Sequence, residues 1–188
     1  MNVAIIGGSS GLGSDVAEHI VKPHNQLVFP ITNLLVTGQA DLDLNDGEWV
    51  SRLRELMVDK FGGPSAATVV VLVAYDRKNQ QDNMQLRVAN TLYEIYRSSS
   101  THLIIVGDVR HHLAPPDSLY TANKRDLWLA AMKMAVDPAR KCPVTLYEPY
   151  TTGLESVSEL ALRIAPAVPG EFFCVSHIMR RSSWNRVL

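Results

Sequence analysis

The sequence has few cysteines, almost no excess of charge and no long apolar run. Its 188 residues include only two cysteines, Cys142 and Cys174, which lie far apart and outside any CxxC spacing. Neither a disulfide framework nor a zinc or other metal site is therefore expected, and two isolated thiols indicate a reducing compartment.

Charges of the two signs nearly cancel. Lysine and arginine total 18 against 19 acidic residues, a net charge of -1, so neither nucleic acid nor an anionic membrane is an expected partner and a small molecule is. No stretch approaches the roughly 18 apolar residues of a membrane span, and the start lacks the charged segment of a signal peptide. We therefore expect a cytoplasmic protein.

What the sequence does contain is enough apolar material for one core. Hydrophobic residues make up 46% of the chain, and 188 residues fit one ordinary domain. We see no internal repeat, low-complexity segment or linker. Residues 1–188 are therefore expected to form a single domain.

Apolar runs alternate with helical patterns along the chain. The run "ATVVVLVA" at 67–74 is apolar on successive residues, which predicts a central strand buried on both faces of a parallel sheet. Further strands are expected at 3–7, 27–31, 39–44, 102–107, 143–148 and 171–175. Helices are expected at 14–21, from a cap at Asn45 or Asp46 to Phe61, and at 84–97, 118–136 and 154–164. Parallel neighbours need crossover helices, so the alternation predicts an α/β fold with a Rossmann-like, doubly wound parallel sheet.

Three glycines, Gly7, Gly11 and Gly13, lie between the first strand and the first helix. A side chain in such a turn would keep a pyrophosphate away from the backbone, while the start of the helix offers unpaired N–H groups and a positive dipole end. The turn therefore predicts a dinucleotide cradle, to which Ser9 and Ser10 add hydroxyl donors. The alternative is a glycine-rich turn that binds nothing.

A second motif is "YTANK", from Tyr120 to Lys124. Residues four apart share one face of a helix. A nearby ammonium lowers the pKa of a phenol from its usual ~10 toward neutral pH, which suits acid-base chemistry. The alternative is a tyrosine and a lysine on a solvated helix face.

Together these motifs resemble the short-chain dehydrogenase/reductase family, and the resemblance covers almost the whole chain. "IGGSSGLG" at 6–13 resembles the cofactor turn T-G-x-x-x-G-x-G, with Ile6 where threonine is usual, and "YTANK" matches the Y-x-x-x-K signature. The resemblance implies that the turn binds NAD or NADP through Gly7, Ser9, Ser10, Gly11, Leu12 and Gly13.

The same resemblance implies three catalytic residues. Tyr120 would donate a proton to a carbonyl oxygen during hydride transfer, and Lys124 would bind the cofactor ribose. Asn90, in the helix after the central strand, matches the family's structural and catalytic asparagine.

Two further segments resemble cofactor contacts of the family. "LDLND" resembles the segment in which an aspartate contacts the adenine, which is Asp43 here. "EPYTTG" resembles the segment flanking the nicotinamide, and it implies contacts from Pro149 and Thr152, with Tyr150 where glycine is usual.

The chain also departs from the family. Gly107 stands where a serine usually donates to the substrate oxygen, and an ionised Asp108 beside Tyr120 would raise the pKa of the phenol. Tyr75 stands in the segment that replaces N-N-A-G, where it would crowd the cofactor or stack near it. Gly153 leads almost directly into a helix, so the usual substrate cover is reduced or absent.

The expected end of the second strand carries neutral donors, Thr32 and Asn33, and no Lys or Arg occurs from 23 to 51. An acidic residue there would favour NAD and a basic one NADP, so neutral donors leave a slight preference for NADP. The leading hypothesis is an NAD(P)-dependent oxidoreductase that reduces a carbonyl or oxidises an alcohol. The alternatives are a cofactor-binding protein without turnover, in regulation or assembly, and a scaffold that binds no nucleotide.

The helix expected at 118–136 carries apolar residues around more of its circumference than one sheet face can cover. This pattern, and the pairing that the family resemblance implies, predict a homodimer or homotetramer.

Overall fold

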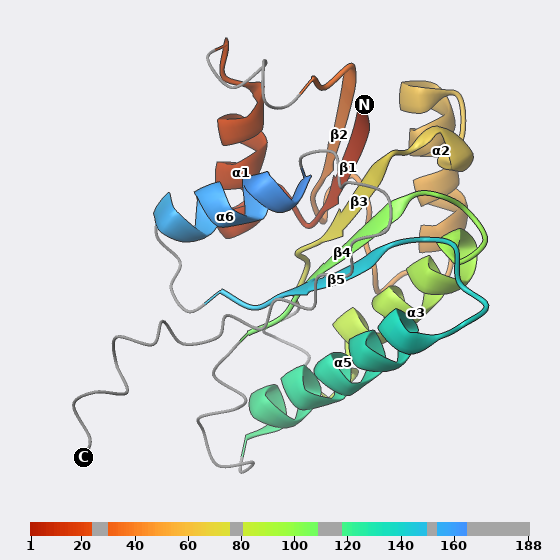
Figure 1. The fold of residues 1–188 in the computed structure, drawn as a ribbon, viewed down its shortest axis with the longest axis vertical. Coiled ribbons are helices and arrows are strands. Elements are labelled where there is room, and N and C mark those ends of the chain that lie inside the picture. Colours follow the sequence, from red (N-terminus) through yellow and green to blue (C-terminus); the bar gives the residue numbers. More distant parts are fainter. Residues whose placement is uncertain (24–29, 76–80, 109–117, 150–153, 165–188) are drawn as a thin grey trace.

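The computed structural model describes residues 1–23, 30–75, 81–108, 118–149 and 154–164 (Figure 1). Its strands are all parallel and lie in the order β2-β1-β3-β4-β5, with bounds β1 Asn2–Ile6, β2 Asn33–Thr37, β3 Val69–Leu72, β4 His102–Val106 and β5 Val144–Tyr147. The helices are α1 Gly11–Val21, α2 Trp49–Phe61, α3 Met84–Tyr96, α5 Leu119–Val136 and α6 Leu154–Ile164, with a short 3-10 helix, η2, at Pro64–Ala66.

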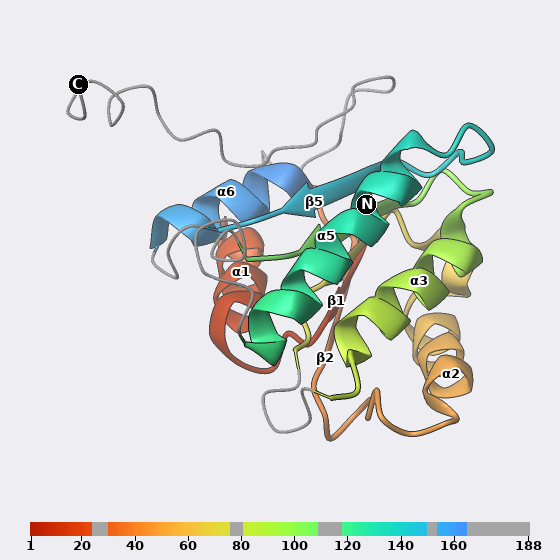
Figure 2. The ribbon, with the colours of Figure 1, turned by 90° about the horizontal axis from the view of Figure 1, so that it is seen from below.

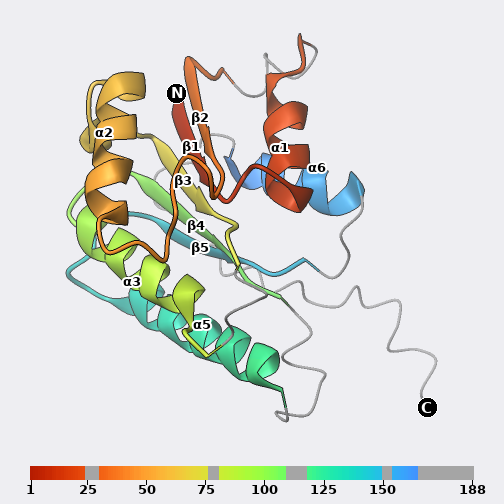
Figure 3. The ribbon, with the colours of Figure 1, turned by 180° about the vertical axis from the view of Figure 1, so that it is seen from behind.

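Helices cover both faces of this sheet. Figures 1, 2 and 3 show α1 and α6 on one face and α2, α3 and α5 on the other. The central strand β3 serves both layers, because successive side chains point to opposite faces. Val69 and Val71 pack with α1 and α6, whereas Val70 and Leu72 pack with the other three helices. This explains the unbroken apolar run that the sequence shows here, and the doubly wound α/β fold is confirmed.

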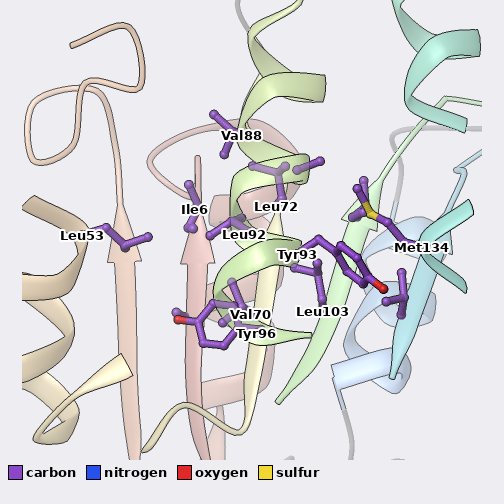
Figure 4. Close-up of a cluster of buried hydrophobic side chains, with 14 of the residues drawn as sticks. Ile6, Leu53, Val70, Leu72, Val88, Leu92, Tyr93, Tyr96, Leu103 and Met134 are labelled. Atoms are coloured by element: carbon purple, nitrogen blue, oxygen red, sulfur yellow. The ribbon is translucent and has the colours of Figure 1, made fainter. Parts of the chain in front are cut away.

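The larger core lies beneath α2, α3 and α5. In Figure 4, Leu53 of α2, Val88 and Leu92 of α3 and Met134 of α5 converge on strand residues. Burying this apolar surface is the main force that holds the helices against the sheet. None of the helices in the described ranges is long and apolar enough to cross a membrane.

A crevice arises where the chain reverses its direction of winding. β1 and β3 are neighbours, yet the connection that follows β1 carries α1 on one face and the connection that follows β3 carries α3 on the other. The carboxyl ends of the two strands therefore diverge, which is where ligands bind in open parallel sheets.

The edge strand differs from the prediction. The expected strand at 27–31 falls partly outside the described residues, and Pro30 and Ile31 are not in a strand. Proline has no N–H for a ladder. The strand that pairs with β1 is Asn33–Thr37, in register from Asn2 with Asn33 to Ile6 with Thr37.

The segment 39–44 is a turn rather than the expected third strand. The N–H groups of Asp41 and Leu42 both donate to the Gly38 carbonyl, and Leu42 and Leu44 point into the core. Apolar and polar residues alternate here because two leucines anchor a loop in the core. The segment makes no β-ladder with another strand of the described residues.

The start of α2 also differs from the prediction. The N-cap residue is Glu48 rather than Asn45 or Asp46, and the Asp46 carboxylate instead accepts a hydrogen bond from the Glu48 N–H at 3.0 Å. In contrast, the expected helices at 84–97, 118–136 and 154–164 and the strands at 102–107 and 143–148 are confirmed to within two residues at either end. The expected strand at 171–175 lies outside the described residues.

A buried histidine lies at the amino end of β4. His102 Nε2 is 2.8 Å from the Thr145 hydroxyl, and its Nδ1 has no hydrogen-bond partner among the described residues. Burial disfavours the charged ring and lowers the pKa of His102 to about 4.

His102 makes the fold sensitive to acid. The unfolded chain takes up a proton at about pH 6.5 that the folded chain takes up only at about pH 4, so this contribution to the free energy of unfolding is present above pH 6.5 and is lost as the pH falls toward 4. The expected loss is about 3 kcal/mol. Urea unfolding between pH 7 and pH 4 is expected to show a shallower pH dependence for His102→Gln than for the wild type. An unchanged pH dependence in His102→Gln would contradict this assignment.

Candidate active site

The glycine turn joins the end of β1 to the start of α1. Gly7 and Gly11 have positive φ angles of 87° and 55°. The N–H groups of Gly7 and Gly8 both donate to the Thr37 carbonyl, at 3.0 and 2.9 Å. A Cβ on Gly7 would lie 2.4 Å from the Ala74 Cα. The turn is thus compressed between β2 and β3, as only glycine allows.

Gly13 lets the first turn of α1 pack directly against this loop. A Cβ there would lie 2.8 Å from both the Gly7 carbonyl oxygen and the Gly8 Cα. Ser10 is the N-cap of α1, and its side chain makes no capping hydrogen bond. A helix start that presents its N–H groups beside a glycine turn suits an anionic group such as a phosphate.

A cleft of about 1260 Å³ runs from this turn across the carboxyl ends of the strands. It brings together nine of the residues predicted for the site: Gly7, Ser9, Ser10, Gly11, Leu12, Asp43, Tyr120, Lys124 and Pro149. Gly13 instead packs against the backbone of the turn. Thr152 lies outside the described residues.

Lys124 is buried inside this cleft, with 5% of its surface exposed. Its Nζ donates to Gln85 Oε1 at 2.6 Å, and it stands 4.5 Å from the centroid of the Tyr75 ring and 5.7 Å from that of Tyr120. Lys124 and the half-buried Tyr120 therefore share one face of α5, and that face lines the cleft.

The Tyr120 hydroxyl donates a hydrogen bond to Oδ2 of Asp108, a buried residue just after β4. The Tyr120 ring meets Tyr75 edge to face, with centroids 5.1 Å apart. A carboxylate acceptor favours the protonated phenol, whereas the nearby ammonium favours the phenolate. Asp108 and Lys124 therefore act in opposite directions on the ionisation of the Tyr120 hydroxyl.

Gly107 leaves no hydroxyl at the end of β4. A Cβ there would lie 3.1 Å from Glu148 Cγ and 3.2 Å from Leu146 Cδ1. A serine at this position therefore requires the Glu148 side chain to shift by a few tenths of an ångström.

Asn90 is not part of this site, which corrects the expectation for it. It is exposed on α3 and lines a groove between α3 and α5 on the outside of the molecule. The α3 residue that reaches Lys124 is Gln85, the second residue of the helix. The sequence could have indicated Gln85, because it is a polar residue within the apolar stripe of Met84, Val88, Ala89 and Leu92.

Thr32 is also misplaced by the prediction. Its N–H donates to the Met1 carbonyl and its hydroxyl accepts from the Met1 amino group, so it lies at the amino end of the sheet. The cleft is at the opposite end, where β2 gives way to Gly38 and Gln39. The error follows from the shifted edge strand.

The loop that carries Asp43 forms one wall of the cleft. Asp43 is exposed, and its carboxylate accepts from the Asn45 N–H at 3.0 Å. The loop is fixed on both sides of Asp43 by the buried Leu42 and Leu44. Arg87 of α3 donates to the Leu44 carbonyl at 3.0 Å, so α3 supports this wall as well.

No family model and no curated protein matches the chain. Solved structures do match. A short-chain dehydrogenase/reductase from Brucella ovis, also solved in complex with a partially ordered NAD, is 16% identical over 87% of this chain and 90% of its own, with a TM-score of 0.60. The 3-alpha-hydroxysteroid dehydrogenase from Pseudomonas sp. B-0831, complexed with NADH, is 14% identical over 88% and 89%, with a TM-score of 0.64. The chain therefore shares its fold with these short-chain dehydrogenase/reductases.

Proposed function

We propose that this protein is an NAD(P)-dependent oxidoreductase that reduces a carbonyl or oxidises an alcohol. The observation that carries the proposal is the content of one cleft, which is lined by the glycine turn at one end and by Tyr120 and Lys124 at the other. Solved structures with this fold hold NAD or NADH, which supports a nicotinamide cofactor.

The residues of the cleft fit such a cofactor. The space that a Cβ on Gly7 or Gly13 would fill is occupied by backbone, and this packing leaves the start of α1 open to a pyrophosphate. Asp43 would contact the adenine and Lys124 the ribose, with Pro149 and Thr152 beside the nicotinamide. The nicotinamide supplies or accepts the hydride.

Tyr120 performs the proton transfer in this proposal. In the reducing direction its hydroxyl gives a proton to the carbonyl oxygen, and the Lys124 ammonium stabilises the phenolate that remains. Before the reaction, Asp108 accepts a hydrogen bond from the Tyr120 hydroxyl. This bond opposes transfer of the Tyr120 proton to the carbonyl oxygen. Gly107 has no hydroxyl that could also donate to the substrate oxygen, so we expect modest turnover.

Gln39 supports a slight preference for NADP. It follows β2 and lines the cleft where the ribose of the adenine half is recognised in this class of fold. The amide is neutral, and a neutral donor tolerates a 2′-phosphate better than a carboxylate does. The nearby Asp41 carboxylate is engaged by the Gly38 N–H at 3.2 Å.

A second candidate is a cofactor-binding protein without turnover. The contact of Tyr120 with Asp108 and the missing hydroxyl at Gly107 favour it, because both weaken acid catalysis. The two candidates share the cofactor and differ in chemistry.

Titration calorimetry with NADH and NADPH tests what they share. Binding at micromolar to submillimolar concentration is expected, tighter for NADPH. Absence of binding by either dinucleotide at millimolar concentration would leave a scaffold that binds no nucleotide. A screen of carbonyl and alcohol substrates with both cofactors then tests the reaction.

Self-association is a further part of the proposal. Helix α5 exposes 45% of Leu129 and 70% of Val136, and Leu129 lines the groove of about 630 Å³ between α3 and α5. We expect a homodimer or homotetramer, and light scattering is expected to give a mass well above 20.8 kDa. Leu129→Lys should yield the monomer, whereas Leu162→Lys, which is 62% exposed on the opposite layer, should not. A wild-type monomer at micromolar concentration would contradict the proposal.

A further inference from the structure

We infer that Gln85 is the positioning residue for Lys124: it fixes where the ammonium lies in the cleft. The inference deepens the proposed function, on which it rests for the identity of the ligand that Lys124 meets. The contact between the two side chains stands independently of that ligand.

Both side chains of the pair are buried. Lys124 is 5% exposed and Gln85 is 3% exposed. A buried ammonium needs hydrogen-bond acceptors, because leaving water costs it far more than a neutral group. Gln85 Oε1 supplies one at 2.6 Å, a short contact of the kind that a charged donor makes.

The amide of Gln85 has only one workable orientation. Its Nε2 donates to the Val106 carbonyl at 2.9 Å. A carbonyl only accepts, so the amide nitrogen must face Val106 and the oxygen must face Lys124. Gln85 thus ties three elements together: the start of α3, the end of β4 and the first turns of α5.

An aromatic ring also lies beside the ammonium. Tyr75, just after β3, presents its ring 4.5 Å from Nζ, within the range of a cation–π interaction. An aromatic face attracts a cation without fixing it at one point, whereas a hydrogen bond sets both distance and direction. Gln85 therefore determines the position of Nζ, and Tyr75 adds attraction.

The first experiment needs no cofactor. The lysines of the native protein are labelled with an amine-reactive reagent, and labelling rates are read by mass spectrometry. Gln85→Met keeps the bulk of the side chain and removes both hydrogen bonds, so Lys124 should label several-fold faster, while the exposed Lys133 labels at the wild-type rate. An unchanged rate at Lys124 would overturn the inference.

The second experiment uses ligands. Gln85→Met is expected to weaken NADH binding about tenfold and to leave 5′-AMP binding unchanged, because AMP lacks the nicotinamide half of the cofactor, whose ribose is the one that Lys124 would meet. Equal losses for both ligands would indicate a merely structural role and overturn the inference. The exposed Asn90→Ala is the matched control on α3 and should bind both ligands as the wild type does.

A double-mutant cycle tests whether Gln85 acts through Lys124. In the Lys124→Met background, Gln85→Met should weaken NADH binding no further. An undiminished tenfold loss there would show that Gln85 acts by another route. If the wild type binds neither NADH nor AMP, the proposed function fails, and the labelling experiment alone decides the role of Gln85.

Discussion

Replacing Gly13 by alanine is expected to lower the affinity for NADH and NADPH by about a hundredfold or more. The added Cβ would lie 2.8 Å from the Gly7 oxygen and the Gly8 Cα, closer than real contacts of this kind come. Both atoms belong to the backbone, so neither can rotate away as a side chain would. Helix α1 must therefore move off the turn, and the N–H groups that would face a pyrophosphate move with it. Titration calorimetry measures the effect.

Gly47→Ala is the matched control. It adds the same methyl group, but nothing lies within 4 Å of it, so affinity and unfolding temperature should stay at the wild-type values. If Gly13→Ala folds and binds both dinucleotides within a few-fold of the wild type, the glycine turn is not the binding site and the proposed function loses its basis.

The buried parts of the fold could be predicted from the sequence and the edges could not. The strands β3, β4 and β5 are buried on both faces, so hydrophobicity alone marks them in the chain. Four of the five residues of β2 are only half-buried, and the run at 27–31 is just as apolar. Which run pairs with β1 is decided by tertiary contacts that no local pattern carries.

The same limit explains which site residues were found. The glycine turn and the pair of Tyr120 and Lys124 depend on local geometry, a tight turn and a spacing of four, and both line the cleft as expected. Asn90 and Gln85 both lie on α3, and spacing along the chain favoured Asn90. A helix rotates by 100° per residue, so five positions place Asn90 about 140° away from Gln85, on the solvent side. Only the structure shows that Gln85 is the residue facing α5.

Replacing Tyr120 by phenylalanine is expected to reduce turnover of a carbonyl substrate by on the order of 10²- to 10⁴-fold. The change removes one hydroxyl and keeps the ring that meets Tyr75 edge to face. NADH binding should stay within a few-fold of the wild type, because Tyr120 serves the chemistry rather than the cofactor. Lys124→Ala should impair both binding and turnover, since its ammonium is expected to meet the ribose as well as the phenolate.

Tyr93→Phe is the matched control for this prediction. The Tyr93 hydroxyl also donates to an aspartate, Asp137, at 2.5 Å, but the pair lies in the outer groove between α3 and α5. Both substitutions thus break a contact between a tyrosine hydroxyl and an aspartate, and only the one in the cleft should slow the reaction. Steady-state rates at saturating cofactor separate the two.

The result for Tyr120→Phe distinguishes an enzyme from a protein that only binds the cofactor. A large loss of turnover with retained binding assigns the proton transfer to Tyr120, despite the carboxylate of Asp108 that opposes it. Equal turnover in the wild type and in Tyr120→Phe would remove Tyr120 from the chemistry. If dinucleotide binding is tight while both proteins are inert across carbonyl and alcohol substrates with both cofactors, the oxidoreductase proposal is contradicted. The absence of a hydroxyl at Gly107 then accounts for the lack of turnover in the wild type, and the protein uses its cleft to bind a cofactor without turnover.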